Sequence, residues 1–140
     1  MPTENVEQSS AVGYKRLVVW KEAHGLVLMI YKTTKTFPKD ELFGLTSQLR
    51  RAVVSIAANI VEGQARSSTK DFRRYIDMAR GSLLESRNHF YLSQKKGYIS
   101  PIEFQEIDAL IEKIFFKAIG FQKWLSKNDS RVSREPRLAG

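Results

Sequence analysis

The sequence predicts an all-α protein, an antiparallel up-down-up-down bundle of four helices. Glycine and proline interrupt the chain in three short stretches, and the four segments between them repeat apolar residues at steps of three and four. No segment shows the alternation of apolar and polar residues that is typical of a strand. Four helices of about 20 to 28 residues joined by short loops favour antiparallel neighbours. We predict a bundle domain at residues 15–127, a flexible segment at 1–14 and a flexible basic tail at 128–140.

The first two predicted helices lie before and after the stretch FPKDE at residues 37–41. The apolar stripe of the first consists of Val19, Ala23, Leu26 and Ile30. That of the second consists of Leu45, Leu49, Ala52, Ile56 and Ile60. Both stripes have the spacing of an amphipathic helix that buries one face.

The third and fourth helices follow the stretches EGQARSST at residues 62–69 and KKGYISP at residues 95–101. The third stripe has one polar member, Ser86, and consists of Phe72, Ile76, Ala79, Leu83, Ser86 and Phe90. The fourth consists of Phe104, Ile107, Ile111, Ile114, Ala118, Phe121 and Leu125. Ser68 or Thr69 and Ser100 are suited to cap the starts of these helices, and Gly63 and Gly97 stand where left-handed C-terminal caps are expected.

Composition and motifs argue against several classes of protein. The 140 residues include no cysteine, and 42% are hydrophobic, so we expect a globular domain in a reducing compartment, most simply the cytoplasm. No run approaches the roughly 20 apolar residues of a membrane span. The only two histidines, His24 and His89, lack ligand-spaced neighbours, and no nucleophile motif or phosphate-binding glycine loop is present. We therefore predict no enzyme, no metal and no cofactor.

The positive charge is concentrated in the middle of the chain. Residues 50–98 contain ten basic against four acidic side chains, so this segment holds six of the eight net positive charges. Such an excess favours a polyanionic or acidic partner. Arg66, Arg73, Arg80 and Arg87 recur at intervals of seven, which places the last three in one row of the third helix, about 21 Å long at 1.5 Å per residue.

That row could contact successive phosphates, because guanidinium groups bind phosphate in a bidentate manner. The predicted nucleic-acid-binding set is Arg50, Arg51, Arg66, Lys70, Arg73, Arg74, Arg80 and Arg87. The alternative is an ordinary solvated helix face, partly neutralised by Asp77 and Glu85.

A line of polar side chains follows the second helix through the otherwise apolar stretch SIAANIVEG. The line consists of Gln48, Arg51, Ser55, Asn59 and Glu62, and it has counterparts on the third helix in Gly81, Ser82 and Glu85. We predict a hydrogen-bonded polar seam between helices or subunits that fixes their register. The rival interpretation is a polar ligand-binding line.

The chain resembles the bacterial family of 23S rRNA intervening-sequence proteins, which is related to the accessory variability determinant of diversity-generating retroelements. The resemblance extends from about residue 17 to 125. It is carried by VVWKEAHGLVLMIYKTTKTFPKDELFGLTSQLRRAVVSIAANIVEG and by KDFRRYIDMARGSLLE. The family pattern falls on Trp20, Phe37, Pro38, Glu41, Gln48, Arg50, Arg51, Ser55, Asn59, Glu62, Gly63, Ala79, Gly81, Ser82 and Glu85. After Glu85 the chain departs from the pattern and continues as SRNHF.

The resemblance implies a four-helix bundle that assembles as a ring, commonly a homopentamer, with a basic surface that contacts nucleic acid or a reverse transcriptase. Together with the charge pattern, it leads us to expect a non-enzymatic binding module for RNA or DNA. The alternative function is a scaffold for an acidic protein or a reverse transcriptase.

Overall fold

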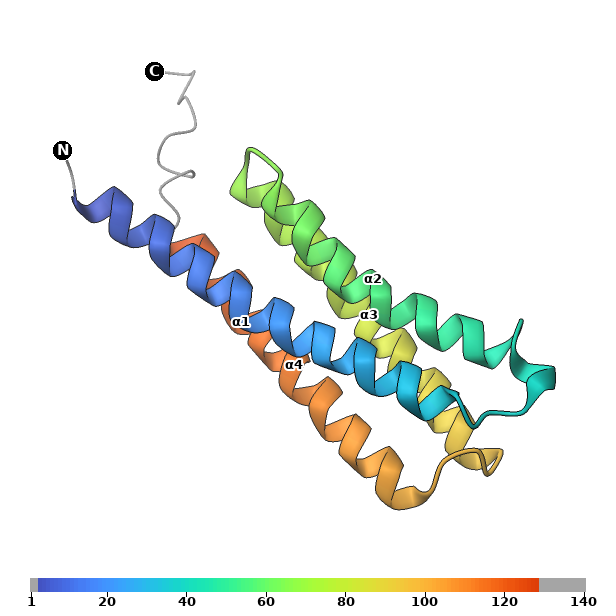
Figure 1. Ribbon diagram of the computed structural model, residues 1–140. Helices are drawn as coiled ribbons and strands as arrows, with labels where there is room; N and C mark the ends of the chain where they lie inside the picture. The colour runs from blue at the N-terminus through green and yellow to red at the C-terminus, as the bar shows by residue number, and fades with distance from the viewer. Residues whose placement is uncertain (1–2, 129–140) are drawn as a thin grey trace.

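The computed structural model describes residues 3–128, with the side chains of residues 13–128 (Figure 1). Its elements are α1 (Thr3–Thr34), the short 3-10 helix η1 (Lys39–Glu41), α2 (Leu45–Gln64), α3 (Thr69–Lys95) and α4 (Pro101–Asn128). The all-helical prediction is confirmed. Helix α1 begins at Thr3, inside the segment 1–14 that we expected to be flexible, and residues 129–140 of the predicted tail lie outside the described residues. The predicted division of the chain stays a prediction.

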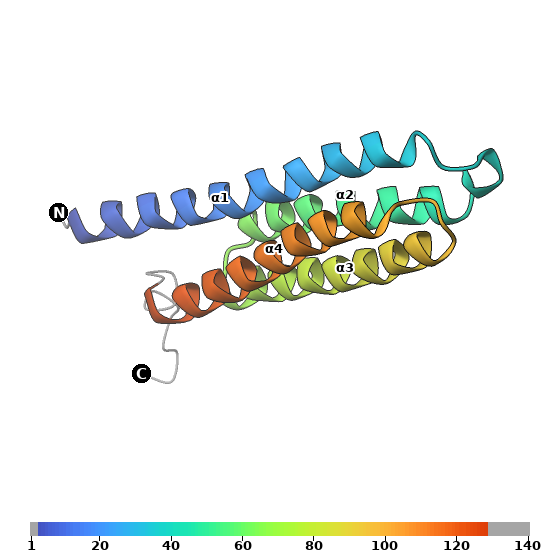
Figure 2. The same ribbon diagram turned by 90° about the horizontal axis from the view of Figure 1, so that it is seen from below.

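Successive helices run in opposite directions and form a four-helix bundle, as Figures 1 and 2 show. Helix α1 packs against α2 and α4, while α3 packs against α2 and α4 from the other side. The α2–α3 pair makes the most extensive contact. The up-down-up-down order is thus confirmed, whereas assembly into a ring stays a prediction for this single chain.

The predicted apolar stripes meet in one core. Every stripe residue is buried except Phe104, which packs against the core from its edge. Phe72 of α3 and Phe121 of α4 meet edge to face, with ring centres 5.4 Å apart. Ser86 fits among these apolar neighbours because its hydroxyl donates to the carbonyl of Ser82 at 2.8 Å, so no polar group there is left without a partner.

Local capping fixes where the helices begin and end. The Ser68 hydroxyl accepts from the backbone N–H of Asp71 at 3.1 Å and starts α3. At α4, Ser100 and Glu103 form a reciprocal capping box with two bonds of 3.1 Å each. Gly97, just after α3, adopts a φ of +80°, so the predicted left-handed cap is confirmed there.

The predicted cap at Gly63 is wrong. Gly63 lies inside α2, which continues to Gln64, and among the described residues positive φ occurs only at Gly97. A Cβ atom on Gly63 would lie 2.8 Å from Phe72 and from Tyr75 of α3. Glycine is therefore needed for close approach of α2 and α3, because any side chain would collide with two aromatic residues.

Glu41 joins the two loops at one end of the bundle. Its carboxylate accepts from the Lys96 amine at 2.7 Å and from the Tyr98 hydroxyl at 2.8 Å. The hydrogen bond from Lys96 is the main reason that the pKa of Glu41 lies below its usual value. The α1–α2 connection is thereby attached to the connection between α3 and α4.

Candidate nucleic-acid interface

The predicted row of arginines lies where α3 faces α4. Arg73 donates to the Ser126 hydroxyl at 2.7 Å, and Arg80 donates to the side-chain oxygen of Gln122 at 2.9 Å. The Arg80 guanidinium also lies over the ring of Phe115, 5.0 Å from its centre. The anchors on α4 are uncharged and hold both side chains in one orientation, but Arg80 also pairs with the Asp77 carboxylate of α3 at 3.1 Å, which partly offsets its positive charge.

Arg87, the last member of the row, has a charged partner on α4. It forms two contacts with the Asp108 carboxylate of α4, at 2.6 Å and 3.0 Å. Asp108 raises the pKa of Arg87 by hydrogen bonding and by its charge. The pair is close to neutral as a unit, so the row is weaker in net charge at this end than the sequence suggests.

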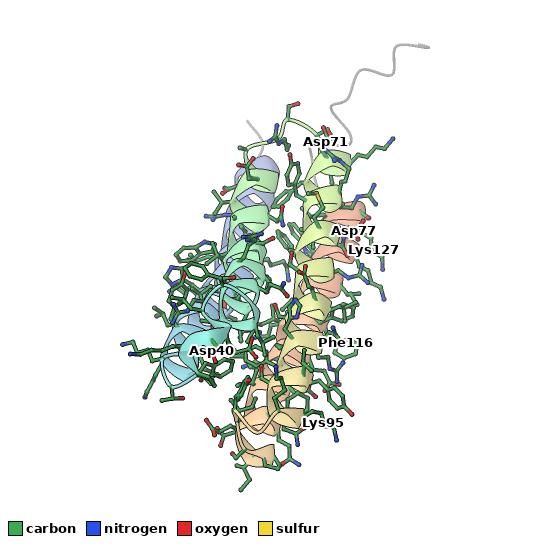
Figure 3. All side chains as sticks on the ribbon, turned by 90° about the vertical axis from the view of Figure 1, so that its right-hand side faces the viewer. Asp40, Asp71, Asp77, Lys95, Phe116 and Lys127 are labelled. Carbon is green, nitrogen blue, oxygen red and sulfur yellow. The ribbon has the colours of Figure 1, made fainter. Side chains whose placement is uncertain are left out.

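A shallow hollow of about 540 Å³ lies between α3 and α4 near the start of α3. It is lined by Lys70, Asp71, Arg73, Arg74, Asp77, Gln122, Lys123 and Ser126. Four of these side chains are cationic and two are carboxylates, which leaves a net excess of two positive charges. Figure 3 shows Asp71 and Asp77 along the same side of the molecule as Lys127 of α4, and Asp40 on the other side. This hollow brings together three of the predicted cations, Lys70, Arg73 and Arg74.

Gln122 and Lys123 were not among the predicted site residues. The side-chain nitrogen of Gln122 donates to the carbonyl of Arg73 at 3.0 Å and to the Asp77 carboxylate at 2.7 Å, while its oxygen accepts from Arg80. Gln122 thus organises three groups of α3. Gln122 directly follows Phe121 in the apolar stripe of α4, and that position was the only signal in the sequence.

The other predicted cations lie elsewhere. Arg50 donates to the Thr34 hydroxyl at 2.9 Å and covers the Tyr31 ring of α1 at 4.7 Å, so it faces α1 and not the groove. Arg51 is exposed on α2. Arg66 follows α2, pairs with Glu62 at 2.9 Å and lies over the ring of a tyrosine. The structure therefore brings five of the eight predicted cations to the α3–α4 groove.

The predicted polar seam is present in a shorter form between α2 and α3. The hydroxyl oxygens of Ser55 and Ser82 are 2.8 Å apart in a hydrogen bond, and Asn59 donates to Ser55 at 3.2 Å. All three side chains are partly buried. These contacts link two helices of the same chain, which is one of the two arrangements that we expected.

The remaining members of the seam are not joined to this group. Gln48 is exposed, Glu62 pairs with Arg66, and Glu85 lies 3.5 Å from the ring nitrogen of His89. Within this chain no other helix approaches Gly81 closely, because a Cβ placed on it would meet nothing within 4 Å. Close approach of α2 and α3 depends on Gly63 instead.

Among residues 3–128, no three His, Asp or Glu side chains are grouped as metal ligands. None of the helices in the same range has a stretch long and apolar enough to cross a membrane.

These features define the chain as a helical-bundle protein with a cation-lined groove between its third and fourth helices. The family model for the 23S rRNA-intervening sequence protein matches residues 15–119, and the chain belongs to this family. No match was found among the curated proteins.

One solved structure with the same fold is a protein of unknown function from the S23 ribosomal protein family of Bacteroides thetaiotaomicron. It is 24% identical in sequence and superposes with a TM-score of 0.72. The match covers 78% of this chain and 98% of the other. At this identity the likeness supports the fold alone.

Proposed function

We propose that this protein is a non-enzymatic binding module for RNA or DNA and that it binds phosphates in the α3–α4 groove. The observation that carries this proposal is the hollow in which Lys70, Arg73, Arg74 and Lys123 converge. Clustered cations in a concave surface focus positive potential and attract polyanions.

The anchoring of the arginines supports the proposal. Arg73 is held by a neutral side chain of α4, Arg80 is held by a neutral side chain of α4 and by Asp77 of α3, and each guanidinium has more donors than these contacts use. Less side-chain freedom is lost on binding when the donors are already oriented. Arg87, which is paired with Asp108, contributes less to this electrostatic attraction.

Phosphate contacts give binding that depends on salt and only weakly on sequence. The logarithm of the binding constant for duplex DNA falls with the logarithm of salt concentration by about 0.9 for each neutralised phosphate. Contacts to phosphates position the nucleic acid but do not read its bases.

The test is an anisotropy titration of labelled RNA and DNA between about 50 mM and 200 mM salt. The variant carries Arg73→Gln, Arg74→Gln and Lys123→Gln. We expect weaker binding and a salt slope that is smaller by about one unit for each phosphate contact removed.

The matched control carries Lys21→Gln, Lys32→Gln and Lys35→Gln, which remove the same charge from exposed positions in α1 and at the residue just after it. Both variants should keep the helical signal and the melting temperature of the wild type. An equal loss of affinity in the control would show that only the total charge matters, and absence of binding at about 50 mM salt would contradict the proposal.

A second candidate function is a protein scaffold, and an apolar groove between α1 and α2 favours it. This groove has a volume of about 390 Å³ and is lined by Trp20, His24, Val27, Val54, Ala57, Ala58, Val61 and Glu62. Exposed apolar side chains grouped in this way are typical of protein interfaces. The candidate occupants are further copies of the chain in a ring, favoured as a pentamer by the family resemblance, and an acidic protein or a reverse transcriptase.

Light scattering of the purified protein distinguishes these occupants. A homo-oligomer that becomes smaller in Val54→Asp would place the subunit contact in this groove. If the protein is a monomer, the groove is available to a different protein. The control Met78→Asp tests whether any new charge on an exposed apolar residue has the same effect on oligomer size.

A further inference from the structure

A second hollow lies farther along the same groove and has a different character. It measures about 290 Å³ and is lined by Leu84, Arg87, Asn88, Tyr91 and Phe104. The rings of Tyr91 and Phe104 meet edge to face with their centres 6.1 Å apart. An apolar and aromatic hollow therefore follows the cationic one.

Tyr91 is the accessible ring of this pair. It is 51% exposed, whereas Phe104 packs against the core and supports it. The amine of Lys95 lies 5.2 Å from the centre of the Tyr91 ring, so a positive charge stands beside the aromatic surface. Asn88, exposed one turn earlier, has an amide that can both donate and accept hydrogen bonds.

The two hollows lie on one side of α3. Asp77, which lines the cationic hollow, and Leu84 and Tyr91, which line the aromatic one, are separated by intervals of seven, so they occupy nearly the same helical face. Arg73 and Tyr91 are separated by about 27 Å along the axis at 1.5 Å per residue. Figure 3 shows Phe116 and Lys95 on the same side of the molecule as Asp77.

Cations along a groove together with exposed aromatic rings are the combination that binds single strands. Bases stack on aromatic side chains without regard to sequence, while the cations follow the backbone. A duplex offers its phosphates to such a groove, but its bases are paired and stacked and cannot lie on a protein ring without being extruded.

We propose that the α3–α4 groove prefers single-stranded RNA or DNA, with phosphates in the cationic hollow and one base stacked on Tyr91. This inference rests on the proposed function. Asn88 lies one turn from Tyr91 and is placed to hydrogen-bond the edge of that base. Lys95 is placed to contact the phosphate next to it.

The test compares anisotropy titrations of three labelled ligands with the wild type and Tyr91→Ala. The ligands are a single-stranded oligonucleotide, its duplex, and a single strand of the same length that lacks bases. The single strand and the duplex are each made as RNA and as DNA, and the strand without bases is made as DNA. We expect the single strand to bind the wild type more tightly than either other ligand. Tyr91→Ala should weaken single-strand binding by roughly 5- to 150-fold, with an unchanged salt slope.

Two further variants serve as controls. Tyr91→Phe keeps the ring and should keep the preference for the single strand. Tyr14→Ala removes a tyrosine that is 69% exposed on α1 and should have no effect. Circular dichroism of all variants checks that the fold is intact, since an exposed ring contributes little to the core.

The outcomes separate this proposal from the proposed function. Equal binding of single strand and duplex, or an unchanged single-strand affinity in Tyr91→Ala, would overturn the stacking proposal while salt-sensitive binding to the cationic hollow remained. Binding of the strand without bases as tightly as the single strand with bases would overturn it in the same way. Absence of binding to all three ligands would contradict both proposals.

Discussion

Helix α3 has two polar edges that are built from side chains of different length. Toward α2, the contact uses the hydroxyls of Ser55 and Ser82, and Gly63 lies directly against α3. Toward α4, the contact uses the arginine row, with Arg73 reaching Ser126. Short side chains let two helix backbones approach closely, and long ones bridge a wider separation.

The difference explains why the candidate binding surface lies beside α4. The α2–α3 pair makes the most extensive contact in the bundle, whereas the α3–α4 edge contains two hollows. A long guanidinium side chain can anchor one nitrogen on α4 and still direct others toward a ligand. A serine hydroxyl has one donor hydrogen, compared with five on a guanidinium, so it has much less capacity to bind a ligand as well.

The largest expected effect comes from filling the close contact at Gly63. Gly63→Ala places a Cβ 2.8 Å from Phe72 and Tyr75, so α2 and α3 must separate, at a cost of about 1–3 kcal/mol of unfolding free energy. Urea unfolding followed by circular dichroism measures this change. An unchanged midpoint would show that the helix pair is not held as closely as described.

The matched variant is Gly81→Ala on the open side of α3. Nothing lies within 4 Å of a Cβ at this position, so the change should stabilise the helix by about 0.5–1 kcal/mol. A loss of stability instead would indicate that a second copy of the chain covers Gly81 in solution.

The next largest effect concerns the hydroxyl pair of the seam. Ser55→Ala should cost about 0.5–1.5 kcal/mol, because it leaves Ser82 without its partner between the helices. Ser82→Ala should cost a similar amount, and the double variant should cost less than the sum of the two. Additive costs in this double-mutant cycle would mean that the two serines do not interact.

Asn59→Leu tests whether the seam also affects assembly. The change removes the bond to Ser55 without lowering helix propensity, so helicity should stay the same. If the seam fixes the register between subunits, the oligomer size measured by light scattering should change. An unchanged size and an unchanged melting temperature would contradict that role.

A smaller effect on stability is expected at the arginine edge. Asp108→Asn removes the charged partner of Arg87, and because the Arg87 side chain is 46% exposed, the loss should not exceed about 1 kcal/mol. Nucleic-acid binding should become tighter, with a salt slope larger by up to about 0.9. Weaker binding would show that Asp108 orients Arg87 for its ligand.

The smallest effect is a change in pH dependence at the end of the bundle. The folded pKa of Glu41 lies below the ordinary value of 4.5, so its stabilising contribution is complete above that value and is lost as the pH falls through the lowered pKa. Glu41→Gln should therefore be less stable than the wild type near neutral pH, with the difference vanishing in acid. Melting temperatures measured across this range check the prediction, and a constant difference would contradict it.

The sequence by itself determined the helices and the core. The apolar stripes were predicted correctly, including the buried polar member Ser86 and except for Phe104 at the edge of the core. They were predictable because the side chains on one helical face are set by local spacing alone. The caps at Ser68 and Ser100 were also predictable, since each bond connects residues three positions apart. Of the eight cations that the sequence singled out, five lie along the α3–α4 groove, but the groove itself was not predicted.

Only the tertiary structure decided which partners the arginines and Gly63 contact. Arg73 meets Ser126 and Arg87 meets Asp108 across 53 and 21 positions of sequence, and Arg50 turns toward α1. The sequence predicted a helix cap at Gly63 because it does not distinguish a glycine that permits a left-handed turn from one that permits close packing of two helices. Local spacing fixes the face on which a side chain stands, but its partner depends on which helix is packed against that face.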